Sequence, residues 1–74
     1  MEYYYEDLEA IKEIVSRHFT VEDVFYEAGF LTFLVAETEI KERFRRLYKD
    51  LKDLRYLPSA RWRDGKVVIR ILRY

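Results

Sequence analysis

The chain has 74 residues, enough for one small domain near the lower size limit at which a hydrophobic core holds a fold without cross-links. It contains no cysteine, which excludes disulfides and thiolate-bound metal, and it starts without the basic and apolar segments of a signal peptide. The formal net charge is zero, which argues against a generally basic nucleic-acid-binding domain, and the longest apolar run, residues 30–36, is too short to cross a bilayer. We therefore expect one cytoplasmic domain over residues 1–74.

Although the net charge is zero, the two halves of the chain carry opposite charges. Residues 1–39 hold ten acidic and two basic residues, a net charge of −8, whereas residues 40–74 hold four acidic and twelve basic residues, a net charge of +8. This division indicates complementary surfaces, either within one molecule or between molecules. In addition, 38% of the residues are charged and Asn and Gln are absent, a composition typical of heat-adapted proteins.

The first predicted element is an amphipathic helix that begins in a run of three tyrosines. Because a helix cannot bury three consecutive rings, the spacing selects Tyr4 as the buried one. The predicted buried stripe consists of Tyr4, Leu8, Ile11, Val15 and His18. Residues 20–27 and 30–35 follow as two strands joined by a tight turn at Gly29.

A second amphipathic helix is predicted over residues 39–54, with Thr38 as its N-cap. Its apolar stripe consists of Ile40, Phe44, Leu47, Tyr48, Leu51 and Leu54. Residues 59–63 and 66–72 then form a second pair of strands around Asp64-Gly65, a dipeptide typical of two-residue hairpins.

The two halves of the chain match each other at a shift of 36 residues. The apolar positions of the helices and strands coincide, and Gly29 falls on Gly65, which is the most specific coincidence. The aligned core pairs are Leu8–Phe44, Ile11–Leu47, Val15–Leu51, Leu31–Val67, Phe33–Ile69 and Val35–Ile71. The pattern therefore predicts two helix–strand–strand repeats. They arose either by duplication or because both halves independently meet the same packing requirement.

These elements predict an α+β fold in which one four-stranded antiparallel sheet, in the order 1-2-4-3, carries both helices on one face. Residues 30–35 and 66–72 are apolar on both faces of their strands, which places them at the centre of the sheet. The strands that contain Glu22 and Arg61 carry charges typical of sheet edges.

Residues able to carry out catalysis are scarce. The only histidine is His18 and the only serines are Ser16 and Ser59, so no nucleophile has a base and an orienting acid. His18 lies on an apolar stripe at a helix end, where a packing or capping role is expected. The chain lacks the His and Cys residues of a zinc site and has no glycine-rich phosphate loop. We expect no enzyme activity, no metal site and no cofactor.

The residues predicted to point away from the helices form the first candidate binding surface. If Phe33 and Ile69 face the helices, the alternation of a strand turns their neighbours to the opposite side, which we call the outer sheet face. Its candidate interaction residues are Phe25, Phe30, Leu34, Val68, Arg70 and Leu72, with Thr32 among them. So large an apolar patch predicts contact with another protein surface, such as a second copy, and a strand end or tail of the same chain is the alternative cover.

A second candidate surface combines arginine with aromatic residues, a pattern that can bind RNA by stacking and phosphate contact. It consists of Arg55, Tyr56, Arg61, Trp62, Arg63, Lys66, Arg70 and Arg73. However, Trp62 aligns with Tyr26 on the core side of the sheet, which predicts that Trp62 is buried. Nucleic-acid binding is therefore the least favoured interpretation.

Several structural positions resemble a known family. They are Val21, Val24, Gly29, Phe44, Leu47, Tyr56, Pro58, Gly65, Val67 and Ile69. In this pattern, which covers nearly the whole chain, the sequence resembles the soluble N-terminal domain of archaeal site-2-type intramembrane zinc metalloproteases and their plant plastid relatives. Position 55 is Arg where that family often has Gly.

The resemblance implies a non-catalytic accessory domain with a role in recognition, regulation or assembly beside a membrane protease. The family's His-Glu-x-x-His motif is absent from this chain and would follow Tyr74, so no catalytic or metal-binding residue carries over. The chain also stops inside a strand pattern, as a domain excised from a longer membrane protein would. The alternatives are a self-standing homodimeric interaction domain and a small RNA- or DNA-binding domain.

Overall fold

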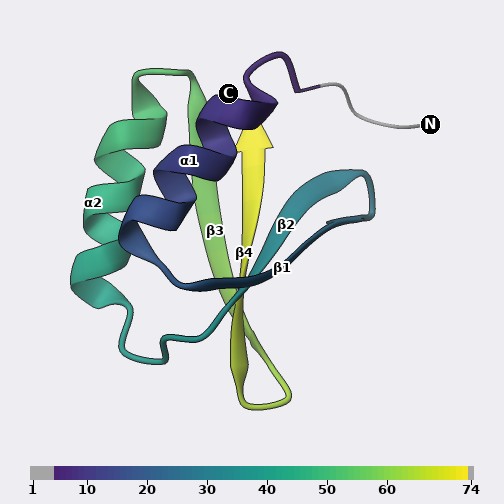
Figure 1. Cartoon of the computed structure of the whole chain (residues 1–74), viewed down its shortest axis with the longest axis vertical. Helices are drawn as coiled ribbons and strands as arrows, with labels where there is room; N and C mark the ends of the chain where they lie inside the picture. The colour runs from purple at the N-terminus through teal and green to yellow at the C-terminus, as the bar shows by residue number, and fades with distance from the viewer. Residues whose placement is uncertain (1–4, 74) are drawn as a thin grey trace.

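The protein forms two helices and one four-stranded sheet (Figure 1). The structure is a computed structural model and describes residues 5–73. In chain order the elements are α1 (Leu8–His18), β1 (Val21–Glu27), β2 (Phe30–Val35), α2 (Lys41–Lys52), β3 (Tyr56–Arg63) and β4 (Lys66–Arg73). The strands pair antiparallel in the order β1-β2-β4-β3, so the predicted α+β fold and strand order are confirmed.

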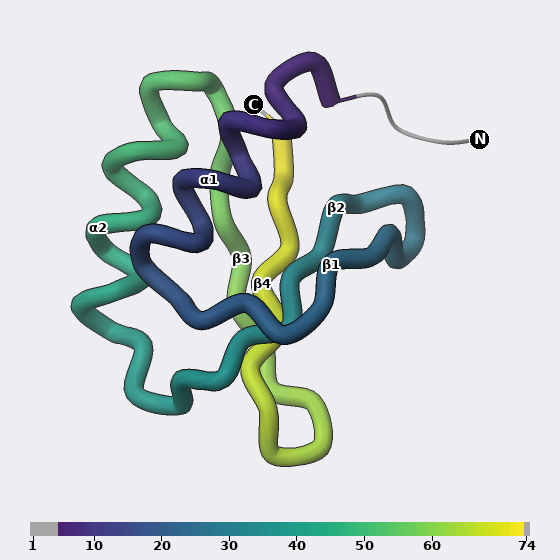
Figure 2. Tube along the Cα trace, in the orientation of Figure 1, coloured from purple at the N-terminus to yellow at the C-terminus, as the bar shows by residue number. Residues whose placement is uncertain are grey.

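The two helices lie side by side in one layer against the sheet (Figure 2). Between the layers lies a core whose largest fully buried members are Phe33, Ile11, Leu31, Leu47, Leu51, Ile69 and Ile71. The side chains predicted to face the helices from the central strands are therefore confirmed as core residues. Because successive residues of a strand alternate between faces, this assignment also fixes the opposite side of the sheet.

The pairing register has an approximate two-fold symmetry that follows the 36-residue shift. Phe33 of β2 pairs with Ile69 of β4, so two repeat-related residues lie opposite each other at the centre of the sheet. The two hairpins have matching registers: Glu27 pairs with Phe30 in the first and Arg63 with Lys66 in the second. The matched halves thus form matched hairpins related by an axis through the centre of the sheet.

Both hairpin loops contain two residues with positive φ, at 53° and 84° for Ala28 and Gly29 and at 51° and 77° for Asp64 and Gly65. This is the type I′ geometry, whose twist matches that of paired strands and which favours glycine at its second position. The predicted turns are confirmed, and the coincidence of the two glycines has a backbone cause.

One tyrosine breaks the symmetry of the sheet. Tyr5 is buried, and its hydroxyl donates to the Ile71 carbonyl oxygen at 2.8 Å and accepts from the Leu31 N–H at 3.0 Å. The β2–β4 pairing ends at Thr32 and Arg70, so the hydroxyl joins the two strands where the next pair would lie. Burial raises the pKa of Tyr5, which keeps the phenol protonated and able to donate. Tyr4, which the spacing had selected for burial, lies outside the described residues.

The ends of α2 differ from the sequence prediction. The helix begins at Lys41 after Ile40, which occupies the N-cap position without a side-chain cap, so Thr38 is not the N-cap. After the helix, Arg55 adopts a positive φ of 68°, a conformation that favours glycine.

Strand β3 starts at Tyr56, three residues earlier than the predicted range of 59–63. It therefore includes Pro58, which cannot donate a hydrogen bond to a neighbouring strand. Because β3 is an edge strand, the backbone nitrogen of Pro58 can face away from β4, where the missing donor does not break the sheet.

Candidate functional site

The outer sheet face lies on the side of the sheet opposite the helices. The register places its members in rows that run across the four strands: Phe25, Thr32, Arg70 and Ser59 form one row, and Asp23, Leu34, Val68 and Arg61 form the next. All six residues predicted as interaction residues therefore lie on this face. Their side chains come from both repeats, so folding gathers them from distant parts of the sequence.

The residues of the outer sheet face are less exposed than the pattern alone suggested. Val68 is only 2% exposed and Thr32 only 1%, although no helix covers them. The other five candidates, Phe25, Phe30, Leu34, Arg70 and Leu72, are half-buried. Long side chains on this face therefore shield its centre and leave the apolar rim partly open to solvent.

A carboxylate bridged by two arginines crosses the outer sheet face. Glu27 accepts from Arg63 Nη2 at 2.6 Å and from Arg70 Nη2 at 3.3 Å through the same oxygen. The hydrogen bond from Arg63, supported by the charges of both arginines, lowers the pKa of Glu27. The same hydrogen bond, together with the negative charge of Glu27, raises the pKa of Arg63. Glu27 and Arg63 are 36 residues apart, so this contact joins equivalent corners of the two hairpins.

Arg70 has a second role on this face. Its guanidinium lies 5.1 Å from the centre of the Phe30 ring, a distance typical of a cation–π contact. Its Nε is buried and has no hydrogen-bond partner among the described residues. A buried donor without a partner is costly, and the contacts of Arg70 with Glu27 and Phe30 offset this cost.

The second candidate surface differs from its prediction at Trp62. The pairing of Trp62 with Val67 places it on the helix side of the sheet as expected, yet its side chain is 62% exposed. Its repeat partner Tyr26 is 51% exposed. Both aromatics lie near the tips of hairpins that extend beyond the helices (Figure 1), so the predicted burial of Trp62 is wrong.

The other residues of the basic aromatic set do not form one surface. Arg63 and Arg70 are held by Glu27, and Lys66 pairs with Glu22 at 2.8 Å. Tyr56 is buried and stacks on Tyr5 with ring centres 5.9 Å apart. Part of the basic half is thus neutralised by the acidic half, which agrees with the prediction of complementary charged surfaces within one molecule.

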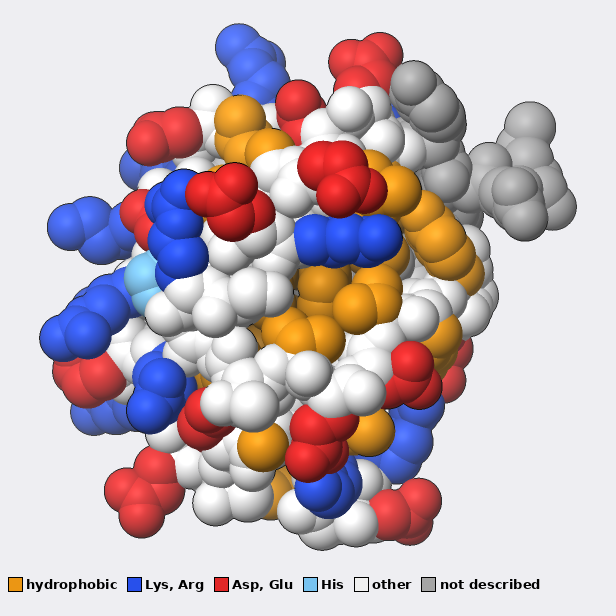
Figure 3. Space-filling view, in the orientation of Figure 1, with side chains coloured by type: hydrophobic (Ala, Val, Ile, Leu, Met, Phe, Trp, Pro, Cys, Tyr) orange, Lys and Arg blue, Asp and Glu red, His pale blue; other side chains and the backbone are white. Residues whose placement is uncertain are grey.

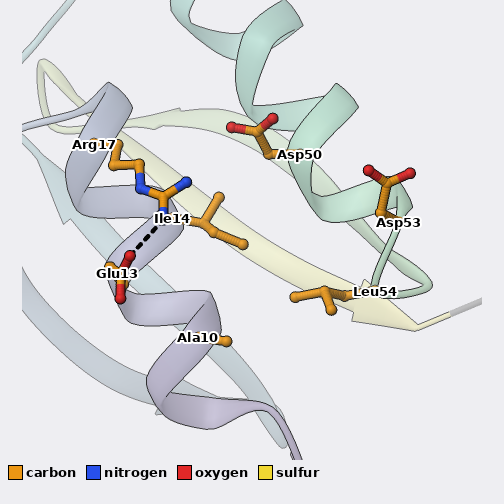
Figure 4. Close-up of a pocket in the computed structure, with 7 residues that line it drawn as sticks. All are labelled: Ala10, Glu13, Ile14, Arg17, Asp50, Asp53 and Leu54. Atoms are coloured by element: carbon orange, nitrogen blue, oxygen red, sulfur yellow. Dashed lines mark hydrogen bonds and ion pairs between the residues drawn. The ribbon is translucent and has the colours of Figure 1, made fainter.

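A shallow depression of about 350 Å³ lies between α1 and α2 (Figure 4). Its lining residues are Ala10, Glu13, Ile14, Arg17, Asp50, Asp53 and Leu54. Arg17 already pairs with Glu13 on the same helix, which occupies its charge. The depression therefore presents carboxylates around an apolar floor and has no free cation or nucleophile.

His18 closes the neighbouring end of the helix pair. Its Nε2 forms a 2.7 Å hydrogen bond with Asp50 Oδ2, and its carbonyl oxygen accepts from Arg43 Nη1 at 2.8 Å. These contacts tie α1 to α2, which agrees with a capping role. Over residues 5–73, no group of three or more His, Cys, Asp or Glu side chains is arranged to hold a metal ion.

No helix in the described part of the chain has both the length and the apolar character needed to cross a membrane. Comparisons with known proteins add no relative, because no family model, curated protein or solved structure matches the chain.

Proposed function

We propose that this chain is a non-catalytic assembly domain that forms a two-fold dimer through its outer sheet face. The observation that carries the proposal is the row Asp23, Leu34, Val68 and Arg61, which runs acid, apolar, apolar, base across the four strands. When two copies of this row face each other in opposite directions, the acid of each copy lies opposite the base of the other.

The geometry of a two-fold axis shows how the row would pair. If the axis runs parallel to the strands above the sheet, β1 of one subunit lies over β3 of the other. Asp23 then meets Arg61 of the second subunit twice, and the half-buried Leu34 lies between these ion pairs, over the side chains that shield Val68. Packed sheets approach to about 10 Å, which these side chains can span. An axis perpendicular to the strands would set acid against acid, so the charges select one arrangement.

Sedimentation equilibrium tests the dimer. Leu34→Glu should abolish association because it places a charge at the centre of the interface, while circular dichroism stays native. The matched control is Val24→Glu on the same sheet but the opposite face, where the side chain is already exposed. A native chain that is monomeric at high concentration would refute the proposal.

Charge reversal supplies a sharper test of the arrangement. Asp23→Arg alone and Arg61→Asp alone should each weaken the dimer, because each creates like-charge contacts across the interface. The double variant should regain association, because the reversed row is again complementary to itself. Failure of the double variant to recover would exclude this axis.

The wider setting of the domain is proposed from the resemblance. The positions that resemble the N-terminal domain of site-2-type metalloproteases support an accessory role at the cytoplasmic side of such a protease. Sequencing the DNA after the codon for Tyr74 tests this setting. An open frame with apolar segments and a His-Glu-x-x-His motif would support it, and a stop codon would remove it without affecting the dimer.

A second candidate function, binding of single-stranded nucleic acid, is favoured by one observation, the 62% exposure of the Trp62 ring. Exposed aromatic rings can stack on the bases of single strands. Trp62 is the only tryptophan of the chain, so its fluorescence reports binding directly. Salt-sensitive quenching by an oligonucleotide would support this function, and unchanged fluorescence would eliminate it.

A further inference from the structure

Helix α2 presents a row of basic side chains to solvent. Lys41, Arg45, Lys49 and Lys52 follow one another at three- and four-residue steps, which aligns them along the side of the helix away from the buried Leu47 and Leu51. Tyr48, which was predicted to belong to the apolar stripe of this helix, instead lies in the same row and is 40% exposed. We name these five residues the α2 basic row: Lys41, Arg45, Tyr48, Lys49 and Lys52.

The charges of the α2 basic row are largely unneutralised. Among residues 5–73, only Arg45 of this row has an ion pair, with Glu42 Oε1 at 3.1 Å. Lys41, Lys49 and Lys52 have none within the same range. Lys and Arg side chains project along the margin of the molecule over α2 (Figure 3).

The symmetry of the fold provides an internal comparison. Subtracting 36 from each position of the α2 basic row gives Tyr5, Glu9, Lys12, Glu13 and Ser16 on or next to α1. That equivalent row has two acids and one base, and Lys12 lies 3.7 Å from Glu9. Both helices pack their apolar sides on the same face of the sheet, and α1 does so without a basic outer row. Packing therefore does not require the basic row on α2.

We propose that the α2 basic row binds the surface of a bilayer that contains anionic lipids. Four bases over about 16 Å of straight helix can all touch one plane, and each basic residue near an anionic membrane strengthens binding about fivefold. An exposed tyrosine within the row suits the headgroup region, where amphipathic rings concentrate. Because the apolar side of α2 is held in the core, the contact is electrostatic and involves no insertion of the helix.

A plane fits this row better than a nucleic acid does. A duplex or a single strand is usually followed by a positively charged groove formed by several elements. The α2 basic row instead lies on the convex side of a single helix. The row also lies across the sheet from the outer sheet face, so this inference does not depend on the proposed dimer.

Vesicle flotation at low ionic strength tests the inference on the 74-residue chain. The native chain should float with vesicles of phosphatidylserine and phosphatidylcholine and remain unbound with phosphatidylcholine alone. A fourfold variant of the row should bind at least a hundredfold more weakly while its circular dichroism stays native. Its substitutions are Lys41→Gln, Arg45→Gln, Lys49→Gln and Lys52→Gln.

The matched control removes the same number of charges elsewhere, at exposed or half-buried bases outside the row. Its substitutions are Lys12→Gln, Arg17→Gln, Arg55→Gln and Lys66→Gln. This control should keep most of the binding, because the proposal assigns it to the row and not to net charge. Equal losses in both variants, binding to neutral vesicles, or binding to an oligonucleotide but not to vesicles would each overturn the proposal.

Discussion

Tyr5 shows how one side chain can extend a sheet that its strands do not complete. Pairing at one end of the β2–β4 ladder reaches Val35 and Val67, and symmetry would place Leu31 opposite Ile71 at the other end. The Tyr5 hydroxyl bridges those two residues instead. Sequence periodicity could not reveal this role, because Tyr5 precedes the helix and its hydrogen bonds depend on tertiary structure.

The bridge predicts a specific loss of stability. Tyr5→Phe keeps the ring but leaves the Leu31 N–H and the Ile71 carbonyl without this partner inside the core. We expect the free energy of unfolding to fall by about 1–3 kcal/mol, measured by urea denaturation. Tyr48→Phe, at an exposed position, should have little effect. Similar small changes in both variants would show that the hydroxyl bridge contributes nothing.

The helices and strands were largely predictable because their apolar positions follow simple periods. Phe33 and Ile69 were assigned to the core side from alternation alone, and both are fully buried. Trp62 was assigned to the correct side but to the wrong environment. Alternation gives the side of a sheet, whereas exposure depends on how far the helices extend over it. The start of α2 was missed because the prediction relied on the capping preference of Thr38, whereas the helix begins after Ile40, which makes no side-chain cap.

The symmetry of the elements predicts matched effects in the two helices. Ile11 of α1 and Leu47 of α2 are repeat partners, and each is fully buried. Ile11→Ala and Leu47→Ala should each lower the free energy of unfolding by about 2–5 kcal/mol, because each leaves a cavity in the core. Ser16→Ala, at an exposed helix position, is the control. Loss of stability in only one helix, by chemical denaturation, would show that the repeats do not share the core equally.

At the scale of the whole molecule, the division of charge is partly resolved within the fold. Glu22 and Glu27 of the acidic half pair with Lys66, Arg63 and Arg70 of the basic half. These contacts join the β1–β2 hairpin to the β3–β4 hairpin. The α2 basic row belongs to the part of the basic half that stays largely unpaired within residues 5–73, so its charges are available to an external partner.

The Glu27 bridge makes stability depend on pH in a defined direction. Arg63 and Arg70 hold the pKa of Glu27 below its usual value of 4.5, so the unfolded chain takes up this proton first as the pH falls. The stabilisation is complete above pH 4.5 and is lost as the pH falls from there through the lowered pKa of the folded state. Glu27→Gln removes the titrating group, so the native protein should be more stable than the variant at pH 7 and lose this advantage below pH 4.5.

Denaturant unfolding of both proteins between pH 7 and pH 3 measures this difference. Other carboxylates titrate in both proteins and largely cancel when the two unfolding free energies are subtracted. Glu9→Gln, at an exposed carboxylate whose nearest base is 3.7 Å away, serves as the control and should show a smaller pH-dependent difference. A difference for Glu27→Gln that stays constant across the range would mean that the two hairpins are held together without the charge of this carboxylate.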